Sequence, residues 1–169
     1  MDGCFLIFAI MDDCDSPGAF MSIWKQEVDL ATINRWSENT LMRAIDIRIT
    51  TIGEDFLRGT MPVDSRTRQP YGILHGGASV ALAETLGSTA AMLCCDEGMA
   101  TVGVEINANH LRAVREGLVT GTARPLHVGR STQVWEIRIE NAAGELTCIS
   151  RLTLAVVPQR AVNTRNVAT

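Results

Sequence analysis

Much of the chain alternates apolar with polar residues, which is typical of strands that bury one face. The clearest case is the stretch 135–140, in which Trp135, Ile137 and Ile139 take every second position and charged residues take the others. Residues 141–145, which include Gly144, are typical of a hairpin turn. The pattern predicts six strands, over residues 44–50, 56–63, 100–111, 118–126, 135–140 and 146–157.

A different pattern covers residues 76–95, which are rich in Ala, Leu, Thr, Ser and Gly, contain no Pro and carry one charged residue, Glu84. This composition predicts a single helix of about five turns. A helix that is apolar on nearly every side lies either inside a protein or in a membrane. A carboxylate in mid-helix is costly in a membrane, so we expect this helix to be buried in the protein. A shorter helix is predicted near residue 30, with Asp29 as its N-cap.

The predicted order is one short helix, two strands, one long helix and four strands, which indicates an α+β protein. An antiparallel sheet of five or six strands could curl around the long helix and cover it from three sides. No internal repeat or linker divides the chain, so we expect a single domain over residues 21–158. Residues 1–20 are expected to be a non-native or mis-called extension that precedes an original start at Met21, and residues 159–169 a flexible tail.

Composition narrows the possible partners and compartments. The 169 residues carry a net charge of −4 without a basic run, so neither nucleic acid nor a membrane is an expected partner. The five cysteines are an odd number and include the adjacent pair Cys94 and Cys95, unlike a secreted disulfide framework. We therefore expect reduced cysteines and a cytoplasmic protein. The three histidines are far apart and show no metal-binding spacing, so no metal is expected.

Glu84 is the first candidate for chemistry. An ionised carboxylate inside an apolar helix has to be paired, hydrogen-bonded or functional, because removing it from water is costly. One interpretation is a structural glutamate that pairs with an arginine or is protonated. The other is a catalytic group, favoured by Ser88, which lies four residues later on the same helical face.

The start of the long helix, His75-Gly76-Gly77, is the second candidate. A helix N-terminus presents N–H groups without intrahelical partners, and two glycines leave room for a carbonyl oxygen, so an oxyanion hole is possible. A simple tight turn is the alternative. Gly76 and Glu84 lie about 12 Å apart along the helix axis, at 1.5 Å per residue. If both act on one carbonyl, a second copy of the helix has to supply one of them, which predicts an active site shared across a two-fold dimer.

Residues 61–79 and 83–88, together with 103–110 and 125–127, resemble the bacterial hotdog-fold acyl-CoA thioesterases. The similarity spans roughly residues 22–157 and is greatest to the branch that hydrolyses aromatic acyl-CoAs, including the dihydroxynaphthoyl-CoA thioesterases of menaquinone synthesis. The resemblance implies a hotdog fold, a curved antiparallel sheet wrapped around one long central helix. It also implies an acyl-CoA or acyl carrier protein substrate, no cofactor, and a homodimer with shared active sites that pairs into a homotetramer.

The same resemblance implies roles for individual residues. Glu84 is the nucleophile or the base that activates water, the Gly76 N–H polarises the thioester carbonyl, Gln69 and His75 line that side, and Ser88 assists from the partner subunit. Residues expected to contact the CoA or acyl portion are Gly103, His110, Leu111, Arg112, Ala113, His127, Val128, Gly129, Arg130, Ser131 and Thr132. The order of residues 129–132 departs from the pattern of the branch.

Three other functions compete with thioester hydrolysis. A hotdog hydratase or dehydratase would move protons on the acyl chain and leave the thioester intact. A non-enzymatic module would bind acyl-CoA without turnover. A cysteine enzyme would use Cys94 or Cys95 with a histidine, but these cysteines lie at the far end of the helix from His75, about 28 Å along one chain.

Overall fold

The computed structural model describes residues 22–161; the predicted extension and most of the predicted tail lie outside this range. Six antiparallel strands form one sheet in the order β1-β2-β4-β5-β6-β3. The strands are β1 (Arg48–Ile52), β2 (Leu57–Pro62), β3 (Met99–His110), β4 (Leu118–Val128), β5 (Thr132–Glu140) and β6 (Leu146–Pro158). The predicted α+β fold with six strands is confirmed.

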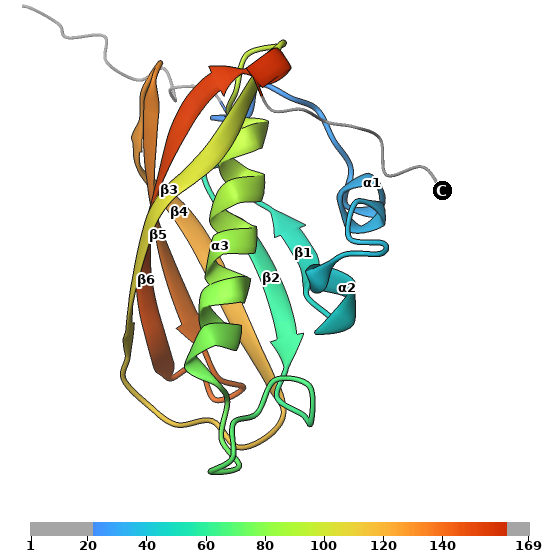
Figure 1. The fold of residues 1–169 in the computed structure, drawn as a ribbon, viewed down its shortest axis with the longest axis vertical. Helices are drawn as coiled ribbons and strands as arrows, with labels where there is room; N and C mark the ends of the chain where they lie inside the picture. Colours follow the sequence, from blue (N-terminus) through green and yellow to red (C-terminus); the bar gives the residue numbers. More distant parts are fainter. Residues whose placement is uncertain (1–21, 162–169) are drawn as a thin grey trace, which may run out of the picture.

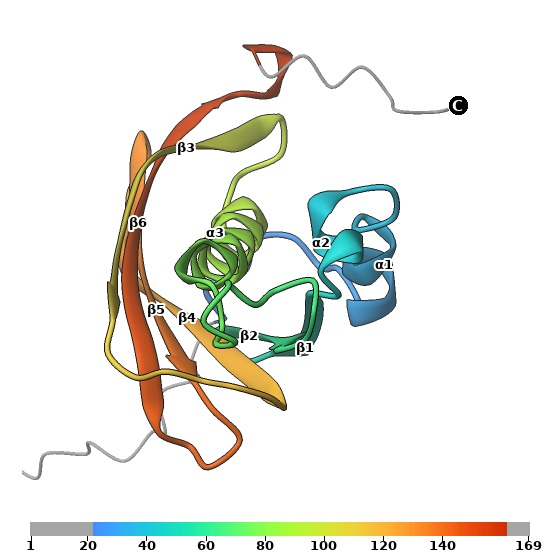
Figure 2. The ribbon, with the colours of Figure 1, turned by 60° about the horizontal axis from the view of Figure 1, so that its bottom comes forward.

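Helix α3 (Gly76–Leu93) lies along the concave face of the sheet, which curves around it (Figures 1 and 2). Leu82 and Leu86 of this helix and Trp135 and Ile137 of β5 are fully buried between the two layers. Burial of such side chains contributes roughly 1.5–3 kcal/mol each relative to exposure. No helix within residues 22–161 is long and apolar enough to cross a membrane.

Two glycines in the sheet let α3 lie close to it. Gly59 of β2 and Gly121 of β4 are opposite each other, and Leu86 of α3 lies in the recess that they leave. A Cβ added at Gly121 would come within 2.4 Å of a Leu86 methyl, and one at Gly59 within 2.8 Å of the other methyl. The sheet therefore accommodates a large helix residue at the point where it lacks side chains of its own.

Replacing Gly121 with alanine should lower the free energy of unfolding by about 1–3 kcal/mol, because the methyl group overlaps the fully buried Leu86. Urea denaturation of the purified protein measures this change. The double variant Gly121→Ala/Leu86→Ala should lose less than the sum of the two single variants, since removing Leu86 relieves the overlap. Strict additivity would contradict the proposed contact.

The N-terminal elements cover the β1 edge of the molecule, as Figure 2 shows. Helix α1 (Leu30–Arg35) begins as predicted, with the Asp29 carboxylate accepting from the Thr32 N–H at 2.6 Å. The strand predicted from residue 44 was wrong at its start. Leu41–Ala44 form helix α2, and Asp46 adopts a left-handed turn with φ 56°. The alternation hid this turn because Ile45 and Ile47 pack on the same core as the strand residues.

The segment before α1 binds the far end of α3. The backbone N–H groups of Lys25 and Gln26 donate to the Leu93 carbonyl at 2.8 and 3.1 Å, and the Gln26 side chain donates to the Met92 carbonyl at 3.1 Å. These bonds satisfy carbonyl groups that a helix C-terminus leaves without intrahelical partners. Trp24, from the same segment, stacks on Trp135 with ring centroids 6.3 Å apart.

Strand β3 is an edge strand, because it pairs with β6 on one side and with nothing else among residues 22–161. It is twelve residues long, and Val104 on it is 66% exposed. A long edge with exposed apolar side chains is a surface on which another strand can pair. A register shift between Gly103 and Glu105 marks a β-bulge in the middle of this strand.

Candidate active site

A pocket of about 430 Å³ lies at the N-terminus of α3. It brings together six of the residues that the sequence predicted for the site: Gln69, Gly76, His110, Leu111, Arg112 and Ala113. The loop before α3 supplies Gln69, and the segment that follows β3 supplies residues 111–113. These residues are far apart in sequence, so the fold creates the grouping.

Gly76, which lines this pocket, carries the first backbone N–H of α3. The first N–H groups of α3 after it are already bonded: Gly77 donates to His75 Nδ1 at 2.8 Å, and Ala78 and Ser79 donate to the His75 carbonyl. The Gly76 N–H has no acceptor among residues 22–161. A backbone donor without an acceptor therefore belongs to a residue that lines the pocket, and an oxyanion hole uses a donor of this kind.

Two histidines frame this donor. His75 is the N-cap of α3, and because its Nδ1 accepts from the Gly77 N–H, its neutral ring carries the proton on Nε2. The His110 ring lies over Gly76, where an added Cβ would be 2.8 Å from His110 Nε2. A side chain at position 76 would collide with His110, so the glycine keeps the pocket open at the donor.

Glu84 lies two turns further along α3 and is half-buried. Its carboxylate makes no hydrogen bond and no ion pair with any group of residues 22–161, so the structure gives no support to a structural Glu–Arg pair within the described protomer. One carboxylate oxygen lies against Gly103 of β3 instead. The sheet covers α3 from its other sides, as predicted, and on this remaining face Val80, Ala81, Glu84 and Ser88 are only partly covered.

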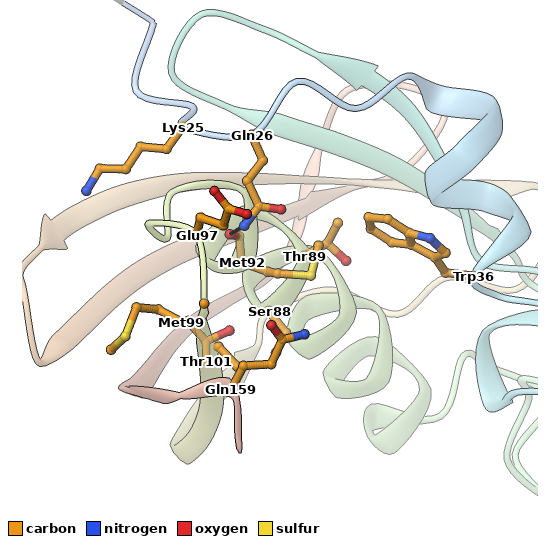
Figure 3. A pocket seen from close by; sticks show the side chains of 12 residues that line it. Lys25, Gln26, Trp36, Ser88, Thr89, Met92, Glu97, Met99, Thr101 and Gln159 are labelled. Carbon is orange, nitrogen blue, oxygen red and sulfur yellow. Dashed lines mark hydrogen bonds between the residues drawn. The ribbon is translucent and has the colours of Figure 1, made fainter. Parts of the chain in front are cut away.

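Ser88 lines a second pocket, of about 710 Å³, on the exposed face of α3 (Figure 3). Thr89 and Met92 extend the helix side of the pocket, Trp36 closes the α1 end and Thr101 comes from β3. Of these five residues, Ser88 alone was predicted from the sequence as a site residue. The other four are ordinary apolar or hydroxyl residues of α3, β3 and the end of α1, and only their positions in the fold reveal them.

Residues 127–132, which were predicted to contact the CoA or acyl portion, lie between the end of β4 and the start of β5 and line neither of these two pockets. Val128, Gly129 and Arg130 line a third pocket, of about 530 Å³, together with Lys25 and both cysteines of the adjacent pair. The His127 ring lies against Gly129, whose N–H donates to the Thr132 carbonyl, and the Ser131 carbonyl accepts from the Val156 N–H. Strand β4 continues through Pro125, with a register shift between Pro125 and His127.

The two arginines that line these pockets differ in their partners. Arg112 of the 430 Å³ pocket has its Nε 3.6 Å from a Glu145 carboxylate and donates to the Leu146 carbonyl. Arg130 makes no ion pair within residues 22–161. Among the same residues, no group of His, Cys, Asp and Glu side chains is arranged to hold a metal ion.

The adjacent cysteines are poor nucleophiles. Burial raises the pKa of the Cys94 thiol to about 12 and also raises the pKa of Cys95. With these raised pKa values both side chains are protonated at neutral pH, and they are unreactive because the thiolate is the reactive form. Iodoacetamide at pH 7 should therefore leave thioester hydrolysis unchanged. The measurement is activity instead of labelling, because a count of labelled thiols would include Cys4 and Cys14, which lie outside the described residues. Inactivation by iodoacetamide that bound substrate prevents would point to a cysteine enzyme.

Known proteins match both the sequence and the structure. The family model of the Thioesterase superfamily matches residues 71–148. The 1,4-dihydroxy-2-naphthoyl-CoA hydrolase of Escherichia coli is 52% identical over 135 residues, which cover 80% of this chain and 99% of that protein. The proofreading thioesterase EntH of Cronobacter turicensis is 51% identical over 135 residues, with 80% and 98% coverage.

A solved structure gives the same result for the fold. A thioesterase from Haemophilus influenzae superimposes with a TM-score of 0.79 at 51% sequence identity, covering 80% of this chain and 95% of that one. The curved sheet around α3 is the architecture that the resemblance to hotdog enzymes implied. This chain therefore belongs to the thioesterase superfamily and is a hotdog-fold thioester hydrolase.

Proposed function

We propose that this chain hydrolyses aromatic acyl-CoA thioesters to the free acid and CoA, with Glu84 as nucleophile or general base. The observation that carries the proposal is the half-buried Glu84 carboxylate, which has no partner within the described protomer and lies on the same face of α3 as a large pocket. A carboxylate held in this way is available to a substrate or to a water molecule.

The chemistry needs one donor and one carboxylate on the same carbonyl carbon. The Gly76 N–H would donate a hydrogen bond to the thioester carbonyl oxygen and so stabilise the negative charge that develops on it. Glu84 would attack the carbonyl carbon to form a mixed anhydride that water then cleaves, or would take a proton from an attacking water molecule. In either route the C–S bond breaks, CoA leaves as a thiolate that is then protonated, and a C–O bond forms in its place.

The two groups lie in different parts of one protomer. Gly76 lines the 430 Å³ pocket, whereas Ser88, one turn beyond Glu84, lines the 710 Å³ pocket, and neither of these two pockets contains both Gly76 and Ser88. We infer that a second copy with its α3 antiparallel completes each site, so that the enzyme acts as a homodimer. The free edge of β3 and the partly exposed face of α3 offer surfaces for this copy. Pairing of dimers into a homotetramer and a cytoplasmic location are part of the same proposal.

The 710 Å³ pocket is suited to the acyl group. Trp36, Met92 and Met99 give it a largely apolar wall, with hydroxyl groups of Thr89 and Thr101 between them. An aromatic acyl group would bury its faces against such a wall. The E. coli relative is named for a dihydroxynaphthoyl-CoA substrate, which supports an aromatic acyl group here.

Replacing Trp36 with alanine should raise KM for benzoyl-CoA and dihydroxynaphthoyl-CoA about tenfold or more, because an aromatic contact is lost. The KM for a short aliphatic acyl-CoA should change less. A thiol reagent measures the CoA released from each substrate. Leu41→Ala is the matched control, since Leu41 is 63% exposed and lies outside the pocket. An equal change for all substrates would contradict an acyl pocket at Trp36.

A further inference from the structure

We propose that Gly103 is a positioning residue for Glu84. The absence of a side chain at this point of β3 is what allows the carboxylate to lie against the strand. The inference rests on the proposed function, because it takes Glu84 to be the group that reacts. Gly103 was predicted from resemblance to contact CoA or the acyl group; the structure places it next to the carboxylate instead of in any of the three pockets described above.

Position 103 faces the helix. Gly103 is opposite Leu154 of β6, which is fully buried on the face of the sheet that covers α3. Residues opposite each other in neighbouring strands point to the same face. Other β3 residues on this face, Ile106 and Ala108, have side chains that pack against the core. Gly103 therefore interrupts a row of side chains between β3 and α3.

The carboxylate of Glu84 lies in this gap. A Cβ built on Gly103 would be 2.8 Å from Glu84 Oε1 and 3.9 Å from Glu84 Cδ, and the next nearest groups are more than 4 Å away. Cβ atoms essentially never approach another heavy atom to less than 3.0 Å. Any other residue at position 103 would therefore displace the carboxylate.

The backbone does not explain the glycine. The glycines with left-handed φ among the described residues are Gly72, Gly98, Gly117 and Gly144, and Gly103 is not one of them. The bulge next to it therefore does not require a residue without a side chain. A glycine inside a strand lowers stability, and close approach of another group is a common reason for it. Here the approaching group is Glu84.

The contact matters because little else holds the carboxylate. Glu84 makes no hydrogen bond or ion pair within residues 22–161, so the helix backbone and the surface of β3 define where its oxygens can lie. A reacting group misplaced by about 1 Å can lose roughly 100-fold in rate. A methyl group at position 103 would move the carboxylate by less than this, and it should reduce kcat without removing any substrate contact.

The test is a double-mutant cycle on thiol release. Gly103→Ala should lower kcat about tenfold or more, with KM within about twofold of wild type. Glu84→Asp shortens the side chain by one methylene and leaves room for the methyl group. In that background the added Gly103→Ala should change kcat by less than about twofold. Leu41→Ala, which alters an exposed side chain away from β3 and outside the three pockets, is the control and should retain wild-type kcat.

The outcomes separate this inference from the proposed function. Wild-type release of thiol, and its loss on replacing Glu84, tests the function alone. An unchanged kcat in Gly103→Ala, a change confined to KM, or an equal loss in both backgrounds would overturn the positioning role. A crystal structure of Gly103→Ala should show the carboxylate displaced, which is a measurement independent of activity. If Gly103→Ala does not fold, restored folding in Glu84→Asp/Gly103→Ala supports the contact, and continued misfolding overturns it.

Discussion

Glu84→Gln will lower kcat/KM for thioester hydrolysis by about 10²–10⁴-fold, the range expected when a general base or nucleophile is lost. Glutamine preserves the size of the side chain, so its fit against Gly103 is maintained while the charge is removed. The measurement is free CoA, followed with a thiol reagent over benzoyl-, dihydroxynaphthoyl-, short-chain and long-chain acyl-CoAs.

The matched control is Glu105→Gln, which removes a carboxylate from the same strand that Glu84 contacts. Glu105 is exposed, and its carboxylate accepts from the Asn107 side chain instead of facing α3. Activity should be retained in this variant. A Glu84→Gln enzyme with wild-type kcat/KM would show that Glu84 is not the reacting group. A folded wild-type protein that releases no thiol from any substrate would favour the hydratase or binding-module alternatives.

Mixing two inactive variants will restore activity if each site is built from two chains. Gly76→Pro removes the N–H that has no acceptor in the described chain, and it should lower kcat by about 10²–10³-fold. The backbone conformation suits proline, because proline is favoured at the first position of a helix and His75 before it is already extended. The proline Cβ meets the His110 ring as the alanine Cβ of the control does. Co-expression of Glu84→Gln with Gly76→Pro should recover about a quarter of wild-type activity, since half of randomly formed dimers contain one intact site of two.

The control for this experiment is Gly76→Ala, which adds a Cβ near His110 but keeps the N–H. Its kcat should exceed that of Gly76→Pro. Lack of recovery on co-expression, in samples where mass spectrometry detects mixed dimers, would mean that each protomer carries a complete site. The separation of Gly76 and Glu84 would then have to be bridged within one chain.

The strands could be predicted because each buries one face, and the long helix because it buries most of its surface. Trp135, Ile137 and Ile139 are fully buried, as their spacing required, and α3 begins at Gly76 as predicted. The turn at Asp46 could not be recognised, because residues on either side of it bury isoleucines in the same core. Hydrophobic spacing reports which residues are buried, and it does not report whether a strand or a short helix buries them.

The candidate site, too, could be predicted from the sequence only in part. Glu84 and Gly76 could be found from sequence, since a lone charge in an apolar helix and paired glycines at a helix start are unusual. The approach of Glu84 to Gly103 could not, because it depends on which β3 residue comes opposite the helix after a bulge. Trp36 and Thr101 likewise reach one pocket from elements that are separated by more than sixty positions in the sequence.

The bonds between the N-terminal segment and the far end of α3 affect how the chain can be extended. Lys25 and Gln26, which bind the last turn of the helix, also line the 710 Å³ pocket, and Gln159 near the other end of the described chain lines it as well. Both ends of the fold thus lie at the rim of the same cavity. A bulky group attached next to Lys25 or Gln159 is therefore expected to alter access to this pocket.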